Sequence, residues 1–120
     1  MILIIGGAYQ GKLDFAKSAF SVTDDEVHTC SMGMPDFSKR CIYELEAFAA
    51  DHPDPVGYFC AHREDWKDSI LIMQDIFCGV VPMGEDLRAW RRNAGRLAQY
   101  LAKEADQVYR VFCGLEQRLK

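Results

Sequence analysis

The sequence predicts an α/β fold, a three-layer sandwich in which a mainly parallel sheet of about four or five strands lies between helices. Unbroken apolar runs at residues 1–5 and 69–73 are typical of parallel strands that are buried on both faces. Segments with helical spacing of apolar residues lie between such runs, and strands that alternate with helices form parallel sheets. The length of 120 residues is close to that of a common domain, so we expect residues 1–120 to form a single domain.

A glycine-containing loop follows the first strand and leads directly into a helix over residues 13–20. The positions of Gly6, Gly11 and Lys12 match the P-loop pattern G-x-x-x-x-G-K-[ST], in which backbone amides and the lysine hold nucleotide phosphates. We therefore predict a P-loop-type sandwich that binds ATP or GTP, with Lys12 as a catalytic residue. The alternative is a tight turn whose lysine only lies at the surface. The predicted nucleotide-binding residues are Gly6, Gly7, Ala8, Tyr9, Gln10, Gly11, Lys12 and Leu13.

Leu13 stands where the P-loop pattern has serine or threonine. The hydroxyl of that residue binds Mg²⁺, whereas a leucine side chain cannot bind a metal ion. We therefore predict no metal ligand in the loop, and we expect phosphate binding to be better supported than phosphoryl transfer. Asp14, the next residue, is expected to point away from the loop along the helix.

Between the first helix and the strand at residues 69–73, the sequence predicts one strand and two helices. Residues 26–30 alternate between polar and apolar side chains, which favours a strand. Prolines within residues 52–55 end the first of the two helices, and for residues 56–66 we favour a helix, although periodicity alone does not exclude a strand. The first helix is expected to be capped by Asp36, to turn Glu44 and Glu46 outward, and to bury Phe37, Cys41, Leu45, Phe48 and Ala49.

The last third of the sequence predicts a loop, a long helix and a final strand. Residues 76–84 contain glycine and proline and are expected to form the loop. Residues 107–112 are expected to form the strand, and residues 114–120 a short tail. The long helix between them has an apolar stripe of Leu87, Trp90, Ala94, Leu97, Leu101 and Ala105, and we interpret Arg88, Arg91, Arg92 and Arg96 as its solvent-exposed face.

Composition and charge limit the classes of function that we expect. The formal net charge is −4, which argues against nucleic acid as a partner because binding it requires a basic surface. The apolar run at residues 1–5 is too short for a membrane span or a signal peptide, so we expect a cytoplasmic protein without membrane contact. The five cysteines include no C-x-x-C pair, and we interpret them as small buried hydrophobic residues rather than as zinc ligands.

Both ends of the sequence resemble the bifunctional adenosylcobinamide kinase and adenosylcobinamide-phosphate guanylyltransferase of cobalamin biosynthesis. The glycine loop is similar to the family's G-G-A-R-S-G-K-S. Residues 74–120 resemble, without a gap, the family's N-E-V-G-x-G-I-V-P, then F-R-D-x-A-G-R-x-N-Q-x-L-A-x-x-A-D-x-V and a glycine-led tail. The residues that carry this second resemblance are 74–82, Leu87, Arg91, 94–96, Gln99, Leu101, Ala102, Ala105, Asp106, Val108 and 114–120.

The resemblance implies a kinase and nucleotidyltransferase that uses ATP or GTP, acts on a corrinoid and forms a trimeric homo-oligomer. It places Asp75 at the family's strand-end glutamate, so we predict a catalytic role for Asp75, with a simple turn cap as the alternative. Other positions depart from the family. Leu13 replaces the P-loop serine, and Met83 and Arg92 replace acidic residues.

The middle of the chain is also shorter than in the family. The family carries a second acidic strand motif there, together with the histidine that accepts the guanylyl group. His62 is the candidate for a remnant of that histidine, and we favour a structural role for it.

Three hypotheses follow from these residues and this resemblance. We favour a shortened, catalytically impaired member of the family that binds ATP or GTP and acts as a regulatory or scaffold subunit. The first alternative is an active small kinase that holds Mg²⁺ through water and Asp75. The second is an oligomeric assembly module in which the loop has lost its function and apolar surface is covered by association.

Overall fold

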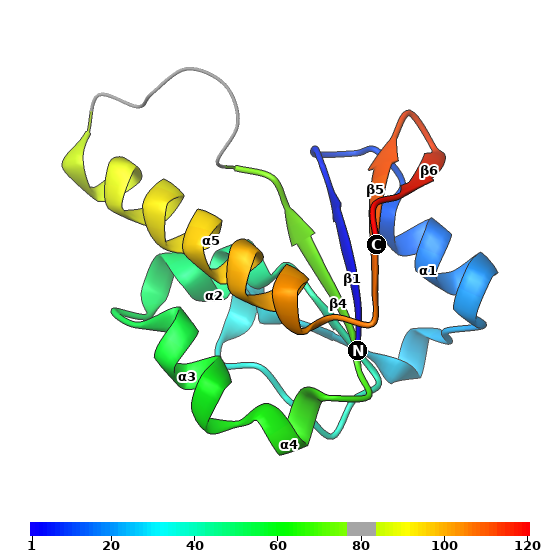
Figure 1. The fold of residues 1–120 in the computed structure, drawn as a ribbon, viewed down its shortest axis with the longest axis horizontal. Coiled ribbons are helices and arrows are strands. Elements are labelled where there is room, and N and C mark those ends of the chain that lie inside the picture. The colour runs from blue at the N-terminus through cyan, green and yellow to red at the C-terminus, as the bar shows by residue number, and fades with distance from the viewer. Residues whose placement is uncertain (77–83) are drawn as a thin grey trace.

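The computed structural model describes residues 1–76 and 84–120, and its fold is a mixed α/β fold built on a six-stranded sheet (Figure 1). The strands lie in the order β2–β3–β4–β1–β5–β6. Their bounds are Ile2–Gly6 for β1, Val27–Thr29 for β2, Cys41–Tyr43 for β3, Ile70–Gln74 for β4, Gln107–Phe112 for β5 and Leu115–Arg118 for β6. The α-helices of the described residues are α1 Lys12–Phe20, α2 Leu45–Asp51, α3 Pro55–Ala61, α4 Arg63–Trp66 and α5 Glu85–Glu104.

Strand β1 lies inside the sheet, where it pairs in parallel with both β4 and β5. Its last residue, Gly6, lies opposite Gln74 of β4 and Val111 of β5. Strands β2 and β3 continue the parallel arrangement beyond β4, and β6 is antiparallel to β5. The carboxyl ends of β1, β3 and β4 therefore meet at one edge of the sheet, where ligands bind in folds of this class.

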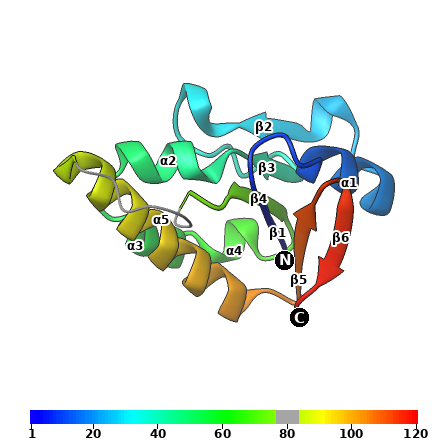
Figure 2. The same cartoon turned by 90° about the horizontal axis from the view of Figure 1, so that it is seen from above.

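Helices cover both faces of the sheet, and each face has its own apolar cluster. Helix α1 lies on one face, and α2, α3, α4 and α5 lie on the other, as the two views together show (Figures 1 and 2). The cluster under α1 contains Ile4, Ala16, Val22, Cys41, Ile70, Ile72 and Val111. The larger cluster on the opposite face includes Leu3, Phe48, Phe59, Trp66, Leu71, Leu97 and Leu101. This layered arrangement is consistent with the predicted P-loop-type α/β sandwich.

Most of the predicted elements are confirmed. The strands predicted at residues 1–5, 26–30, 69–73 and 107–112 correspond to β1, β2, β4 and β5, and the long helix to α5. Residues 56–66 are helical, as we favoured, in α3 and α4. Burial on α5 follows the predicted stripe from Ala94 to Ala105, whereas Leu87 is 51% exposed.

The helix predicted from Asp36 is wrong in its first half. Residues Cys41–Tyr43 form strand β3 between β2 and β4, and the helix begins only at Leu45. Asp36 instead accepts hydrogen bonds from the backbone N–H and the hydroxyl of Ser38, as in a local turn. The apolar spacing of a helix fitted these residues by coincidence. Cys41 belongs to strand β3 and is buried in the cluster under α1, whereas Phe48 belongs to α2 and is buried in the cluster on the opposite face.

The sheet has six strands instead of the four or five predicted, because β3 and β6 were missed. Residues 114–120 were predicted to be a tail, yet Leu115–Arg118 pair with β5. All side chains of β6 are exposed, so the strand has no apolar periodicity that a sequence pattern could detect. Its hairpin turn depends on Cys113 and Gly114, whose φ angles of 52° and 76° suit a two-residue turn.

Cysteine burial also differs from the prediction. Cys30 and Cys41 are buried, and burial raises the pKa of the Cys30 thiol to about 12 and that of Cys41 to about 11. Cys60 and Cys113 are exposed, which corrects the expectation that the cysteines are buried. Cys78, Met83 and most of the loop predicted at 76–84 lie outside the described residues. Among the helices of residues 1–76 and 84–120, none has the length and apolar character of a membrane span.

Candidate functional site

The loop between β1 and α1 has a backbone that only certain residues permit. A Cβ atom on Gly6 would lie 2.5 Å from the backbone oxygen of Val111, so a side chain does not fit there. Gly11 caps the start of α1 with a φ of 94°, a left-handed conformation that glycine adopts without strain. Two of the glycines in the P-loop pattern are therefore required by the geometry of this loop.

Lys12 lies inside the loop. It is only 6% exposed, and its Nζ donates a hydrogen bond to the carbonyl oxygen of Gly7 at 2.6 Å. Burial lowers the pKa of Lys12 from its ordinary value, while the nearby carboxylates of Glu46, Asp75 and Glu44 oppose that shift. Lys12 is therefore not at the surface, as the alternative of a simple tight turn assumed, because its ammonium is held close to the backbone of the loop.

A cavity of about 530 Å³ opens beside the loop and the start of α1. The loop forms one wall, and the ends of β3 and β4 contribute the rest through Tyr43, Glu44 and Gln74. Six of the predicted binding residues line it, namely Ala8, Tyr9, Gln10, Gly11, Lys12 and Leu13. Gly6 and Gly7 precede this wall, and Gly6 is the last residue of β1.

The turn between β5 and β6 holds the loop from the other side. The backbone N–H of Cys113 donates to the side-chain oxygen of Gln10 at 2.6 Å, and the N–H of Gly114 donates to the backbone oxygen of Gln10 at 2.9 Å. A Cβ atom on Gly11 would lie only 3.5 Å from the Cα atom of Gly114. Both segments lie at the same end of the molecule, beyond the carboxyl end of β1 (Figure 1).

Carboxylates surround the lysine. Asp75 follows β4, and its backbone N–H donates to the oxygen of Gly6 at 3.0 Å. Its Oδ1 lies 3.8 Å from the position that a Cβ atom on Gly7 would take. The structure thus brings Asp75 next to the loop, as the predicted catalytic role requires. Asp75 is not among the described residues that line the cavity, whereas Asp14, which we expected to point away from the loop, does line it.

Glu44 and Glu46 were predicted to face outward and do not. Glu44 lines the cavity with a φ of 61°, immediately before α2. Glu46 accepts a hydrogen bond from the backbone N–H of Gln74 at 2.8 Å, and its own backbone oxygen accepts one from the indole of Trp90 at 2.6 Å. Sequence reasoning missed both residues, and Tyr43 with them, because it placed this segment in a continuous helix.

The phenol of Tyr43 lies in a region of negative electrostatic potential at this edge of the sheet. The pKa of its phenol is raised, first by burial and then by the charges of Glu44, Glu46 and Asp14. The ring is half-buried and packs against the cluster under α1. Among the described residues that line the cavity, Lys12 is the one cation, and Asp14 and Glu44 contribute carboxylates.

The residues at the site do not fit a directly bound metal ion. Leu13 lines the cavity and packs partly against the cluster under α1, so it presents only carbon where the P-loop pattern has a hydroxyl. No group of three metal-binding side chains occurs within residues 1–76 and 84–120. A divalent cation at this cavity would lack the hydroxyl ligand of the P-loop pattern and would depend on a bound phosphate, on water and on single carboxylates such as that of Asp14 or Glu44.

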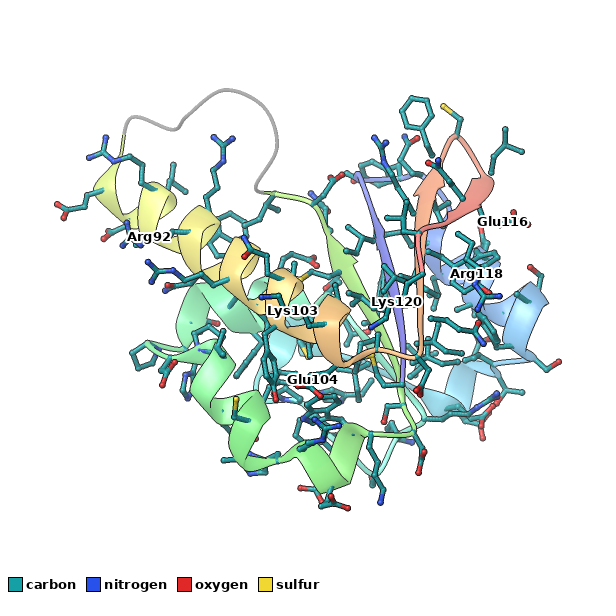
Figure 3. The ribbon with its side chains drawn as sticks, viewed as in Figure 1. Arg92, Lys103, Glu104, Glu116, Arg118 and Lys120 are labelled. Carbon is teal, nitrogen blue, oxygen red and sulfur yellow. The ribbon has the colours of Figure 1, made fainter. Side chains whose placement is uncertain are left out.

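The three histidines and Arg92 lie away from the cavity. His62 stacks on Tyr58 and lies 2.8 Å from the Tyr58 backbone oxygen through its Nδ1, as the favoured structural role requires. Neither His28, His52 nor His62 lines the cavity. Arg92 projects from a part of α5 that is far from β1 and α1 (Figure 3).

A comparison with protein families finds a match. The family model described as cobinamide kinase / cobinamide phosphate guanyltransferase matches residues 55–119, from α3 to the end of the β5–β6 hairpin. A comparison with curated proteins finds no match. The matched segment contains Asp75 and the hairpin that holds Gln10, whereas the glycine loop precedes it.

Proposed function

The family model matches more than half of the chain, which therefore belongs to the cobinamide kinase / cobinamide phosphate guanyltransferase family, and we propose that it binds ATP or GTP at the glycine loop. We propose in addition that it transfers the phosphoryl group poorly or not at all. The family implies the use of a nucleotide and a corrinoid, so the acceptor at this site would be a corrinoid.

The observation that carries the proposal is that the loop residues and Lys12 form the wall of the cavity at the start of α1. Backbone N–H groups at a helix start carry partial positive charge and bind phosphate oxygens. In P-loop proteins, the lysine neutralises the β- and γ-phosphates. Lys12 already lies inside the loop, so it could reach a phosphate in the cavity by exchanging its bond to Gly7.

Impaired transfer follows from Leu13. Phosphoryl transfer depends on charge stabilisation by a metal that bridges the phosphates, and this contribution is several kcal/mol. A leucine at the position of the metal-binding hydroxyl removes one ligand of that metal. Ground-state binding of the nucleotide depends less on this ligand, because the amides and Lys12 remain. For such an impaired member we propose a regulatory or scaffold role in corrinoid metabolism, as a cytoplasmic protein that forms a trimer as the resemblance to the family implies.

Calorimetric titration with ATP and GTP, each with and without Mg²⁺, tests the proposal. We expect micromolar binding that is lost in Lys12→Met, a variant that keeps a long apolar side chain in the buried position. Lys17→Ala is the matched control, because Lys17 lies in the same helix and pairs with Asp24 outside the cavity. Absence of binding to both nucleotides in the wild-type protein would contradict the proposal.

An active kinase is a second candidate, and the position of Asp75 favours it. Its carboxylate lies beside Gly7, where it could hold a hydrated metal near the phosphates. This candidate requires Mg²⁺-dependent release of ADP in the presence of a cobinamide acceptor, with loss of turnover in Asp75→Asn. A turnover at the level of the protein-free reaction would leave binding as the function.

A further inference from the structure

Tyr9 is the most exposed large side chain at the site. Its relative exposure is 102%, which means that no described part of the fold covers the ring. Its φ of 58° is in the left-handed region, which residues other than glycine rarely adopt. An uncovered aromatic ring on a strained backbone gives the free protein no packing energy, and strain of this kind is concentrated at ligand-binding sites.

The backbone on either side of Tyr9 is held in place. The side-chain N–H of Gln10 donates to the backbone oxygen of Ala8 at 3.3 Å, which closes the loop around Tyr9. Gln10 is in turn fixed to the β5–β6 turn by its two hydrogen bonds to Cys113 and Gly114. The ring therefore projects from a fixed point on the wall of the cavity.

The charges at the cavity explain why an uncharged contact would strengthen the binding of a nucleotide. Within residues 1–76 and 84–120, Lys12 is the one cation that lines the cavity, and the acidic residues Asp14 and Glu44 line it as well. These carboxylates repel a polyphosphate and offset part of the attraction by Lys12 and the loop amides. Stacking on an aromatic ring involves no net charge, so it adds affinity that the carboxylates do not oppose.

We infer that the ring of Tyr9 stacks on the base of the bound nucleotide and makes the site selective for a ligand that carries a base over inorganic polyphosphate. This inference rests on the proposed nucleotide binding and names the part of the ligand that the loop recognises besides its phosphates. Aromatic rings stack on every base, so Tyr9 accepts adenine and guanine alike.

The experiment compares Mg²⁺-ATP with Mg²⁺-tripolyphosphate by calorimetry on the full chain. Tyr9→Ala should weaken the binding of ATP by about tenfold and change that of tripolyphosphate by less than about twofold. Tyr9→Phe keeps the ring and should bind both ligands as the wild-type protein does. Thermal unfolding of each variant shows whether the loop substitution has left the fold intact.

Equal affinity of Tyr9→Ala and wild-type protein for ATP would overturn the inference and leave the proposed function standing. Equal weakening of both ligands would also overturn it, because the substitution would then act through the loop backbone. If wild-type protein binds tripolyphosphate in a Lys12-dependent manner but gains nothing from the base, only this inference fails. If it binds neither ligand, the proposed function itself fails.

Discussion

The side-chain oxygen of Gln10 accepts a hydrogen bond from the backbone N–H of Cys113 at 2.6 Å. This contact joins the glycine loop to the hairpin turn 103 residues further along the chain. The hairpin lies within the segment that matches the family, and the loop lies outside it. The phosphate-binding geometry proposed here therefore depends on a segment that contributes no residue to the lining of the cavity.

Replacing Gln10 with alanine should loosen the loop without unfolding the protein. The variant loses the bond to Cys113, which is worth about 1 kcal/mol for a single hydrogen bond. Nucleotide affinity should fall several-fold, because the loop amides must then be ordered by the ligand itself. Calorimetry and urea unfolding measure the two effects, and Gln117→Ala on the exposed strand β6 is the control. An affinity loss no larger than that of the control would contradict the role of this contact.

Gly6→Ala should destabilise the fold by about 1–3 kcal/mol, as overpacking of a close contact does. The added Cβ would lie 2.5 Å from the backbone oxygen of Val111, and a backbone atom in the sheet cannot move aside cheaply. Gly7→Ala is the control, because its Cβ would meet the nearest atom, in the Gln10 side chain, at 3.5 Å. Urea unfolding of the two variants should separate them clearly. Equal stability of both would show that β1 and β5 adjust at Gly6.

The part of the site that the sequence predicts is the part formed by contiguous residues. The glycine loop and Lys12 follow one another along the chain, and their spacing alone predicts a phosphate-binding loop. Glu44 and Tyr43 reach the cavity only because β3 lies beside β4, and a strand of this length is too short for its periodicity to be recognised. The hairpin contact to Gln10 could not be predicted for a different reason: its donors are backbone N–H groups of Cys113 and Gly114, which no side-chain pattern indicates.

The buried ammonium of Lys12 should make stability depend on pH in the alkaline range. Burial lowers its pKa below the ordinary 10.5 in the folded protein, so the unfolded chain binds more protons between the lowered value and 10.5. The contribution of Lys12 to the free energy of unfolding therefore increases as the pH rises through that interval. Below it, lysine is charged in both states and the cost of burial is present in full.

Urea unfolding of wild-type protein and Lys12→Met over a series of pH values tests this dependence. The free energy of unfolding of the wild-type protein should rise relative to that of Lys12→Met as the pH approaches 10.5, because methionine carries no proton. Taking the difference removes the titration of the other lysines and of Tyr43, whose raised pKa acts in the same range. A difference that is constant from neutral pH to 10.5 would mean that the lysine is hydrated in solution.

Leu13→Ser should create a dependence of ATP affinity on Mg²⁺ that we expect to be weak in the wild-type protein. The serine hydroxyl would stand at the start of α1 on the wall of the cavity, where it can bind a metal held by the phosphates. We expect Mg²⁺ to increase the affinity of this variant for ATP by about tenfold, or 1.4 kcal/mol, and to have little effect on the wild-type protein. The substitution should also cost about 1 kcal/mol of stability, because Leu13 packs partly against the cluster under α1.

Leu13→Ala separates these two consequences, since it loses the same packing and gains no oxygen. Calorimetric titrations with ATP are carried out in Mg²⁺ and in a chelator, on both variants and on the wild-type protein. For each protein they give the ratio of the ATP affinity with Mg²⁺ to that without it. A ratio that rises in Leu13→Ser alone assigns the effect to the hydroxyl. If Leu13→Ser and Leu13→Ala respond equally to Mg²⁺, the ion does not approach this position, and the replacement of serine by leucine cannot account for impaired transfer.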